Sequence, residues 1–252
     1  MTGTRAVVLA AGRGSRMGSL TSDRPKCLLE AGGRTLLDRQ LAALRAGGIA
    51  EVAVVTGWHA EQFATVPLPR FHNASWARSS MVDSLACAWP WLTEGPVLAC
   101  YGDIVFAPAD VAAIAGESGP ITVAYDPCWL GQWADRFVDP LADAETFRIG
   151  DDGRITEIGG QPASVSEVRG QYLGMVRFEP DGWAAIVDAL AFADARGTRR
   201  DMTGLLGWLI GNGFPDVTGF AVTGPWHEFD HATDLDAGRH VLAELDSALF
   251  PA

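Results

Sequence analysis

Short runs of apolar, often β-branched residues alternate with helical patterns along the first half of the chain. Each helical pattern repeats its apolar residues every three or four positions. Strand, helix and strand repeated in this way predict a mixed, mostly parallel sheet with helices on both faces, an α/β fold of the Rossmann-like type. The predicted strands are Arg5–Ala10, Glu51–Thr56, Val97–Tyr101 and Ile121–Tyr125, and the predicted helices are Thr35–Ala46, Val82–Trp89 and Pro108–Ala115.

Capping residues indicate where these helices begin and end. Thr35 and Asp38 form a capping box at the start of the first helix, and Gly47-Gly48 ends it. We expect Pro90 to stop the next helix, because proline cannot continue one.

The alternation changes after Asp126. Residues 129–145 are aromatic and acidic without a clean period, and Asp151-Asp152-Gly153 is a strong signal for a hairpin. We therefore expect one domain over residues 1–252, with a hairpin and lid region inserted at 126–178. The hairpin strands are Phe147–Ile149 and Arg154–Ile158, the later strands Gln171–Phe178 and Val217–Val222, and the later helices Gly182–Ala193, Met202–Ile210 and Asp234–Leu245.

The overall charge of the chain restricts its partners. With 19 basic and 31 acidic residues, the formal net charge is −12, which argues against nonspecific binding to nucleic acid or to an anionic membrane. Four scattered cysteines without a C-x-x-C pair indicate reduced thiols rather than disulfides or a zinc site. The sequence has neither a signal-peptide pattern nor an apolar run of membrane-spanning length. We therefore expect a cytoplasmic protein that binds neither nucleic acid nor membrane.

The first predicted strand ends in a glycine-rich turn that carries two arginines. Gly12 and Gly14 allow backbone N–H groups to approach an anion closely. Arg13 and Arg16 can add forked donors for phosphate oxygens. Gly18 falls one residue late for the Rossmann fingerprint, and no Gly-Lys-Ser/Thr follows as in a Walker loop. The turn is therefore either a nucleotide cradle of a third kind or simply a flexible turn.

Charged residues elsewhere in the chain fit a phosphate site at this turn. Lys26 follows a proline, which limits backbone freedom where the side chain must be aimed. Asp103 comes directly after a predicted strand, where open α/β sheets bind ligands, and could hold Mg²⁺. Glu228 and Asp230 alternate on an extended segment and so face the same side. The alternatives are a surface lysine and a turn aspartate, and we expect Asp234 to be the N-cap of the last helix.

A polar patch precedes the second predicted helix. Asn73 and the segment 79–85, which includes Ser84, could bind a base or a phosphate through hydroxyls and helix-start N–H groups. Plain N-capping by Ser80 explains part of this pattern equally well. The five histidines show no metal-ligand spacing, and no serine has the context of a hydrolase nucleophile.

Four motifs together resemble a known superfamily. Their similarity is to the nucleotidyltransferases of the sugar-nucleotide pyrophosphorylase superfamily, which have the fold of nucleotide-diphospho-sugar transferases. The motifs are Ala10-Ala-Gly-Arg-Gly-Ser-Arg-Met17, Arg24-Pro-Lys-Cys-Leu28, Tyr101-Gly-Asp103 and Trp226-His-Glu-Phe-Asp230.

Further motifs resemble one branch of that superfamily. Asn73 with Met81-Val-Asp-Ser-Leu85 is similar to bacterial phosphocholine cytidylyltransferases. Motifs in the middle of the chain resemble phosphonate cytidylyltransferases, including those that act on 2-aminoethylphosphonate. The middle motifs are Trp129-Leu-Gly-Gln-Trp133, Arg136-Phe-Val-Asp-Pro-Leu141, Asp143-Ala-Glu-Thr-Phe147, Gly170-Gln-Tyr-Leu-Gly174 and Asp201-Met-Thr-Gly-Leu205.

The resemblance implies that CTP reacts with 2-aminoethylphosphonate, a 2-hydroxyethylphosphonate-like compound or a phosphate monoester, with release of pyrophosphate. It makes Lys26 and Arg16 the catalytic residues, and it assigns Mg²⁺ to Asp103, Asp230 and Glu228. We expect a monomer or a homodimer. The nucleotide-binding residues that the resemblance implies are Leu9, Ala10, Ala11, Gly12, Gly14, Ser15, Ser84 and Gly102.

The middle region is expected to bind the acceptor. Trp129 and Trp133 could form an aromatic wall for an ammonium group, or could simply pack a lid. Arg136 could hold the phosphonate of the acceptor or brace a neighbouring carboxylate. The other acceptor-binding candidates are the acidic residues Asp139 and Glu145, for an amine, and Tyr172.

Two other functions are compatible with the sequence. A sugar-1-phosphate nucleotidylyltransferase would carry the same N-terminal motifs. A nucleotide sensor without activity would keep the fold, but it has no use for an intact lysine and a set of metal-binding carboxylates.

Overall fold

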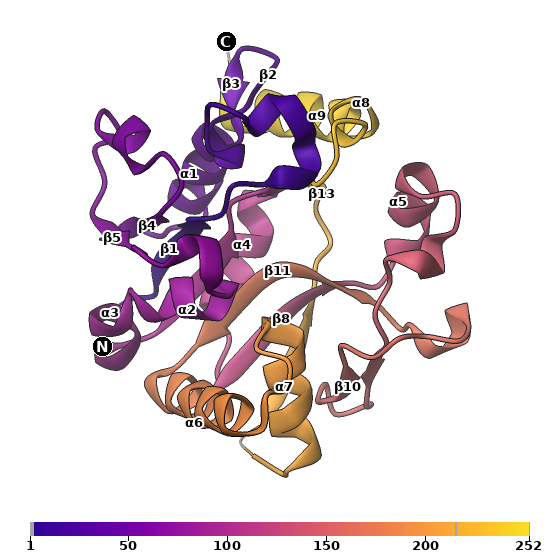
Figure 1. Ribbon diagram of the computed structural model, residues 1–252. Coiled ribbons are helices and arrows are strands. Elements are labelled where there is room, and N and C mark those ends of the chain that lie inside the picture. The colour runs from indigo at the N-terminus through magenta and orange to yellow at the C-terminus, as the bar shows by residue number, and fades with distance from the viewer. Residues whose placement is uncertain (1–2, 215, 252) are drawn as a thin grey trace.

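The computed structural model describes residues 3–214 and 216–251, and its centre is a seven-stranded sheet (Figure 1). Six strands run parallel, and β11 is antiparallel to both of its neighbours, β6 and β8. This arrangement confirms the predicted mixed, mostly parallel α/β fold. In spatial order the strands are β12 (Val217–Ala221), β8 (Ile121–Asp126), β11 (Gln171–Phe178), β6 (Val97–Tyr101), β1 (Arg5–Ala10), β4 (Val52–Thr56) and β5 (Arg70–His72).

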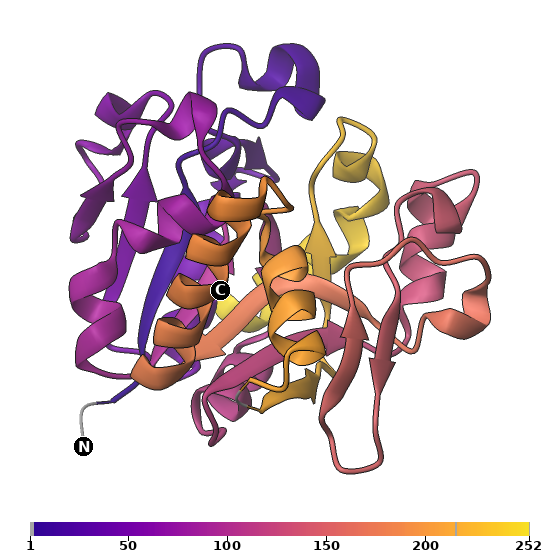
Figure 2. The same ribbon diagram turned by 60° about the horizontal axis from the view of Figure 1, so that its bottom comes forward.

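Helices cover both faces of the sheet because the sheet buries side chains on both. Ala6 and Val8 of β1 point into one hydrophobic core, and Val7 and Leu9 point into the other. Figure 2 shows the orange α6 lying across the second face. The first core packs α1 (Leu36–Ala46), α4 (Pro108–Ala115) and α5 (Trp129–Arg136); the second packs α2 (Met81–Ala86), α3 (Trp89–Glu94), α6 (Pro180–Arg196) and α7 (Met202–Gly211).

Several helix boundaries differ from those predicted. Pro90 does not stop a helix but lies in the first turn of α3, where a missing N–H costs nothing. Residues 129–136 form the helix α5, which the sequence analysis did not predict although its buried residues, Trp129 and Trp133, stand four positions apart as on one face of a helix. The predicted last helix divides at Gly238 into α8 (Asp234–Ala237) and α9 (Arg239–Leu249).

Small antiparallel pairs complete the fold and bring distant segments together. The hairpin predicted around Asp152 is confirmed as β9 (Phe147–Ile149) and β10 (Ile155–Ile158). A second pair joins β7 (Ile104–Phe106) to β13 (Trp226–Glu228), with Ile104 opposite Glu228. Because of this pairing, the turn after β6 lies beside the segment that follows β13. The third pair is β2 (Glu30–Ala31) with β3 (Arg34–Thr35).

None of the helices within the described ranges combines the length and the hydropathy that crossing a membrane requires.

One buried arginine ties the β2–β3 hairpin and the C-terminal helix to α1. The guanidinium of Arg39 donates to both carboxylate oxygens of Asp246, at 2.7 and 2.6 Å. It also donates to the carbonyl oxygens of Ala31 and Arg34, at 2.7 and 2.9 Å. In Figure 1 the yellow α9 accordingly lies beside this hairpin. The hairpin, α1 and the distant α9 therefore share one cation.

We expect Arg39→Met to lower the free energy of unfolding, measured by urea denaturation. A loss of about 2–3 kcal/mol is expected, somewhat less than for a fully buried pair, because Asp246 stays partly exposed to water. Arg239→Met is the matched control, since its partner Asp236 and its own side chain are both exposed, and it should change stability little. Equal losses in both variants would contradict this role of Arg39.

Candidate active site

The glycine-rich turn after β1 is held in one conformation by contacts of its own. Gly14 has φ +67°, and a Cβ there would lie 2.8 Å from Cε of Lys26. Thr21, which is fully buried, donates its hydroxyl to the carbonyl oxygen of Gly14 at 2.8 Å. Gly14 is therefore required both by the backbone conformation and by the close approach of Lys26.

Gly12 differs from Gly14, because the fold itself does not demand a glycine there. Its φ is not positive, and no atom of the described residues lies within 4 Å of the position of a Cβ. The residue faces a pocket instead, which is where a phosphate group would need close access to backbone N–H groups. The pocket is lined by Leu9, Ala10, Gly12, Gly14, Arg16, Lys26, Cys27, Met81, Gly102 and Asp103.

Most of the predicted nucleotide-binding residues line this pocket. Ala11, Ser15 and Ser84 are not among its lining residues. The hydroxyl of Ser84 accepts from Nδ2 of Asn73 at 2.9 Å and donates to the carbonyl oxygen of Ser80 at 3.2 Å. The capping alternative for Ser80 is confirmed, since it forms a capping box with Asp83. Ser84 therefore belongs to a polar network at the start of α2.

Lys26 is the central charge of the site and the single lysine of the sequence. Its side chain is buried, and its Nζ lies 2.8 Å from Oδ2 of Asp103 and 2.6 Å from Oδ1 of Asp230. Arg16 adds a second cation, 2.7 Å from the other oxygen of Asp230. Burial opposes the charge of the Lys26 ammonium, but the two carboxylates outweigh that effect and raise its pKa above the ordinary value. The lysine is therefore a fixed positive charge at neutral pH.

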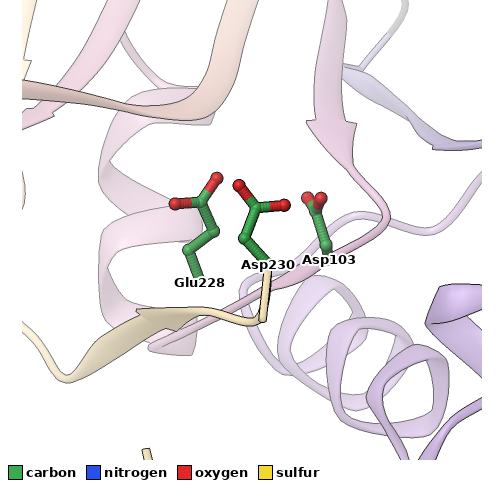
Figure 3. A group of neighbouring side chains, drawn as sticks. All are labelled: Asp103, Glu228 and Asp230. Carbon is green, nitrogen blue, oxygen red and sulfur yellow. The ribbon is translucent and has the colours of Figure 1, made fainter. Parts of the chain in front are cut away.

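Three carboxylates form a cluster beside Lys26. Asp103, Glu228 and Asp230 each offer an oxygen, and these oxygens lie within 4.8 Å of one another. Figure 3 shows them side by side: Asp103 comes from the turn after β6, Glu228 from the end of β13 and Asp230 from the segment that follows it. The two predicted segments are therefore adjacent, and Glu228 and Asp230 face the same side as expected.

The chemistry of this cluster fits a divalent cation. Oδ1 of Asp103 is buried and has no hydrogen-bond partner among residues 3–214 and 216–251. Burial, and then the charges of Asp230 and Asp103, raise the pKa of Glu228 to about 8. A divalent cation that prefers oxygen ligands would give Oδ1 of Asp103 a partner. The same cation would offset the repulsion between Glu228 and the two aspartates.

Arg136 braces these carboxylates, which was one of the two roles expected for it. Its buried guanidinium donates to Oε2 of Glu228 at 2.9 Å and to both oxygens of Asp234, at 3.2 and 3.3 Å. Asp234 in turn accepts from the backbone N–H groups of Asp230 and His231, at 2.7 and 2.8 Å. The prediction that Asp234 is an N-cap was wrong, because Thr233 holds that position.

The two tryptophans expected to face an acceptor lie in the hydrophobic core instead. Trp129 and Trp133 are each 3% exposed, and the indole N–H of Trp129 donates to the carbonyl oxygen of Val168 at 3.1 Å. A wall for an ammonium group needs an accessible ring face, so the alternative of a packed lid describes these residues better. Asp139 caps a short turn by accepting from the N–H of Leu141 at 3.0 Å.

Glu145 and Tyr172 lie with residues that the sequence analysis did not select. The guanidinium of Arg199 donates to Glu145 at 2.9 Å and to both oxygens of Asp201 at 2.9 Å. The rings of Tyr172 and Tyr101 meet edge to face at 5.7 Å. We call this group the Tyr101–Arg199 cluster. Its signal in the sequence was the Asp201-Met-Thr-Gly-Leu205 motif, whose first residue caps α7.

The Tyr101–Arg199 cluster adjoins the carboxylate cluster. Burial raises the pKa of Tyr101, and the negative charges of Asp103, Asp201 and Glu145 all add to this effect. Tyr101 is therefore near enough to the carboxylates of both groups to be affected by their charge. The hydroxyl of Tyr172 is buried and finds no hydrogen-bond partner within the described part of the chain.

Known proteins resemble this chain over most of its length. It is 28% identical to CTP:phosphoglutamine cytidylyltransferase of Campylobacter jejuni over 249 residues, which cover 92% of this chain and 97% of that enzyme. It is 26% identical to 2-aminoethylphosphonate cytidylyltransferase of Lancefieldella rimae over 161 residues, 62% of this chain and 61% of that enzyme. These similarities confirm the predicted resemblance to cytidylyltransferases.

Solved structures share the fold at lower identity. CTP:phosphocholine cytidylyltransferase from Streptococcus pneumoniae has a TM-score of 0.72 at 20% identity, covering 96% of this chain and all of that one. The inositol-1-phosphate CTP transferase from T. maritima has a TM-score of 0.74 at 17% identity, covering 98% of this chain and 97% of that one.

The family described as the MobA-like NTP transferase domain matches residues 6–151, which include the glycine-rich turn, Lys26 and Asp103 and make up more than half of the sequence. The chain therefore belongs to the MobA-like NTP transferase family, and it is an enzyme of the nucleotidyltransferase class.

Proposed function

We propose that this enzyme is a cytidylyltransferase that joins CMP from CTP to a small phosphorylated acceptor and releases pyrophosphate. The observation that carries the proposal is the ammonium of Lys26, held between Asp103 and Asp230 beside the glycine-rich turn. Support for CTP comes from the relatives, since the one that matches along 97% of its length is a cytidylyltransferase.

The residues of the pocket can promote transfer mainly by binding and charge neutralisation. An acceptor oxygen attacks the α-phosphorus of CTP in line, a new oxygen–phosphorus bond forms, and the bond to the β-phosphate breaks to release pyrophosphate. Lys26 and Arg16 offset the negative charge that gathers on the phosphoryl oxygens. The attacking phosphate or phosphonate oxygen is already ionised at neutral pH, so no general base is needed.

We infer that Mg²⁺ is the cation of the carboxylate cluster. Asp103, Glu228 and Asp230 would hold it, since Mg²⁺ in phosphoryl-transfer sites is bound by carboxylates together with substrate phosphates. When bound, the ion supplies positive charge next to the phosphates. Arg136 and Asp234 keep Glu228 and the backbone of Asp230 in place.

We propose further that the acceptor carries an amine and binds at the Tyr101–Arg199 cluster. Glu145 and Asp201 could pair with an ammonium group, and the buried hydroxyl of Tyr172 offers an unused polar group. Arg199 could bind a carboxylate, which an amino-acid acceptor has and an aminoalkylphosphonate lacks. In this proposal the inserted segment 126–178 is the acceptor side of a single domain, because it supplies Glu145 and Tyr172.

The acceptor class can be tested with purified protein, Mg²⁺ and a panel of nucleotides and acceptors. Pyrophosphate release is expected with CTP and either phosphoglutamine or 2-aminoethylphosphonate, with little release from UTP and dTTP. Phosphocholine and a hexose 1-phosphate complete the panel. Turnover confined to the hexose phosphate with UTP or dTTP would instead support a sugar-1-phosphate nucleotidylyltransferase, and no turnover with any of these compounds would remove the acceptor assignment.

A substitution of Arg199 separates the two amine acceptors. Arg199→Met should raise KM for phosphoglutamine about tenfold or more, because its carboxylate loses a charged partner, but should change KM for 2-aminoethylphosphonate much less. Arg200→Met is the matched control, since the partners of Arg200 are Asp83 and Asp194, neither of which belongs to this cluster. Equal effects of both substitutions would remove Arg199 from the acceptor site.

Lys26→Ala should lower kcat by about 10²–10³-fold, because the lost charge matters most in the transition state. The dissociation constant for CTP, measured by calorimetry, should rise only a few-fold. The kcat of Lys26→Arg should lie between those of the wild-type enzyme and Lys26→Ala, since arginine keeps the charge but not the compact ammonium. Wild-type turnover in the alanine variant would show that Lys26 has no part in the reaction.

The affinity for Mg²⁺ in the presence of CTP should depend on pH. Because the pKa of Glu228 is raised to about 8, this group is largely protonated at neutral pH, and binding a cation must displace its proton. Affinity should therefore rise with pH up to about pH 8 and level off above it, as measured by calorimetry. In Glu228→Gln the affinity should be lower and this slope should disappear; an unchanged slope would assign the proton to another group.

A further inference from the structure

Gln40 is a fully buried polar side chain on α1 that the mechanism above does not use. Its neighbours on the same face, Leu37, Leu41 and Leu44, are apolar core residues. Its Nε2 donates to the carbonyl oxygen of Tyr101 at 2.7 Å and to that of Ile104 at 2.6 Å. Burying an amide costs free energy unless the amide forms hydrogen bonds. The presence of Gln40 among leucines therefore needs an explanation, and its two acceptors provide one.

The two carbonyl groups flank the turn that carries Asp103. The main chain of this turn has two other supports: the N–H of Gly102 donates to the carbonyl oxygen of Leu9 at 3.0 Å, and the N–H of Phe229 donates to that of Asp103 at 2.9 Å. The first contact ties the turn to β1, and the second ties it to the segment that carries Asp230. Gln40 spans both ends of the turn with a single group.

A primary amide suits this position better than the alternatives of similar size. One NH₂ group supplies two donors in one plane, which matches two carbonyl acceptors. Glutamate would present acceptors to acceptors and bury a charge. Methionine would fill the space but leave the carbonyl oxygens of Tyr101 and Ile104 without their donor.

We propose that Gln40 is a positioning residue for Asp103: by fixing both ends of the turn, it sets the place of the Asp103 carboxylate relative to Lys26 and Asp230. The proposal rests on the metal-binding role of the carboxylate cluster proposed above. It does not depend on the identity of the acceptor.

Binding of Mn²⁺ in the presence of CTP, followed by electron paramagnetic resonance, tests the proposal without turnover. We expect Gln40→Met to weaken Mn²⁺ binding at least fivefold and to lower kcat about tenfold, with KM for the acceptor changing less than twofold. The matched control is Thr122→Val, which removes a buried hydroxyl that meets the hydroxyl of Thr218 at 3.4 Å, in the sheet away from the pocket. It should lower Tm but leave Mn²⁺ binding unchanged.

A double substitution shows whether Gln40 acts through Asp103. In an Asp103→Asn background, Gln40→Met should cause little further loss of Mn²⁺ affinity, because coupled residues are not additive. Full additivity, or wild-type Mn²⁺ affinity in Gln40→Met, would overturn the proposal. If Gln40→Met fails to fold, Gln40→Asn provides the same test, since its amide is one methylene shorter and should weaken Mn²⁺ binding in the same direction.

The same measurements keep this proposal apart from the proposed function. Loss of Mn²⁺ affinity in Gln40→Met, together with no cytidylyl transfer to any acceptor, would support the positioning role while rejecting the reaction. Turnover by the wild-type enzyme, with no effect of Gln40→Met beyond that of Thr122→Val, would support the reaction while rejecting the positioning role.

Discussion

The contact between one ammonium and two carboxylates organises this molecule. Lys26, Asp103 and Asp230 come from three parts of the chain, and they meet at 2.8 and 2.6 Å in surroundings that largely exclude water. Charges in such surroundings are stable only when they are paired and further hydrogen-bonded. The two ion pairs meet that condition, and Gly14 leaves room for the lysine side chain, since a Cβ there would overlap it. The strands and turns around the pocket therefore have little freedom to shift independently.

The carboxylates of the site are held in place by a chain of contacts that begins at α5. Arg136 lies on α5, and it joins Glu228 and Asp234. Asp234 then accepts from the backbone at Asp230. On the other side, the β7–β13 pair sets Glu228 opposite Ile104, directly beside the turn that carries Asp103. Two independent supports thus converge on Glu228 and Asp230, and the cations Lys26 and Arg16 offset the charges of Asp103 and Asp230.

The sequence predicted the parts of this structure that local patterns encode. The strand at residues 97–101 and the helix at 108–115 were predicted with their observed bounds, because their apolar runs and capping signals agree. The residues that line the pocket belong to short motifs that the sequence analysis had singled out. The suggestion of an aromatic wall at Trp129 and Trp133 did not hold, because tertiary packing places both side chains in the hydrophobic core. Gln40 gave no signal, because its partners Tyr101 and Ile104 lie more than 60 positions away in the sequence and meet it only once the chain has folded.

The presence of a single lysine has a consequence for how this site can be observed. Every other basic side chain in the sequence is a guanidinium or an imidazole, so isotope labelling of lysine would mark one side chain only. Its ¹⁵N resonance would report the hydration and protonation of the pocket directly, free of overlap from surface amines. The enzyme thus carries a spectroscopic probe at the place where phosphate charge would accumulate.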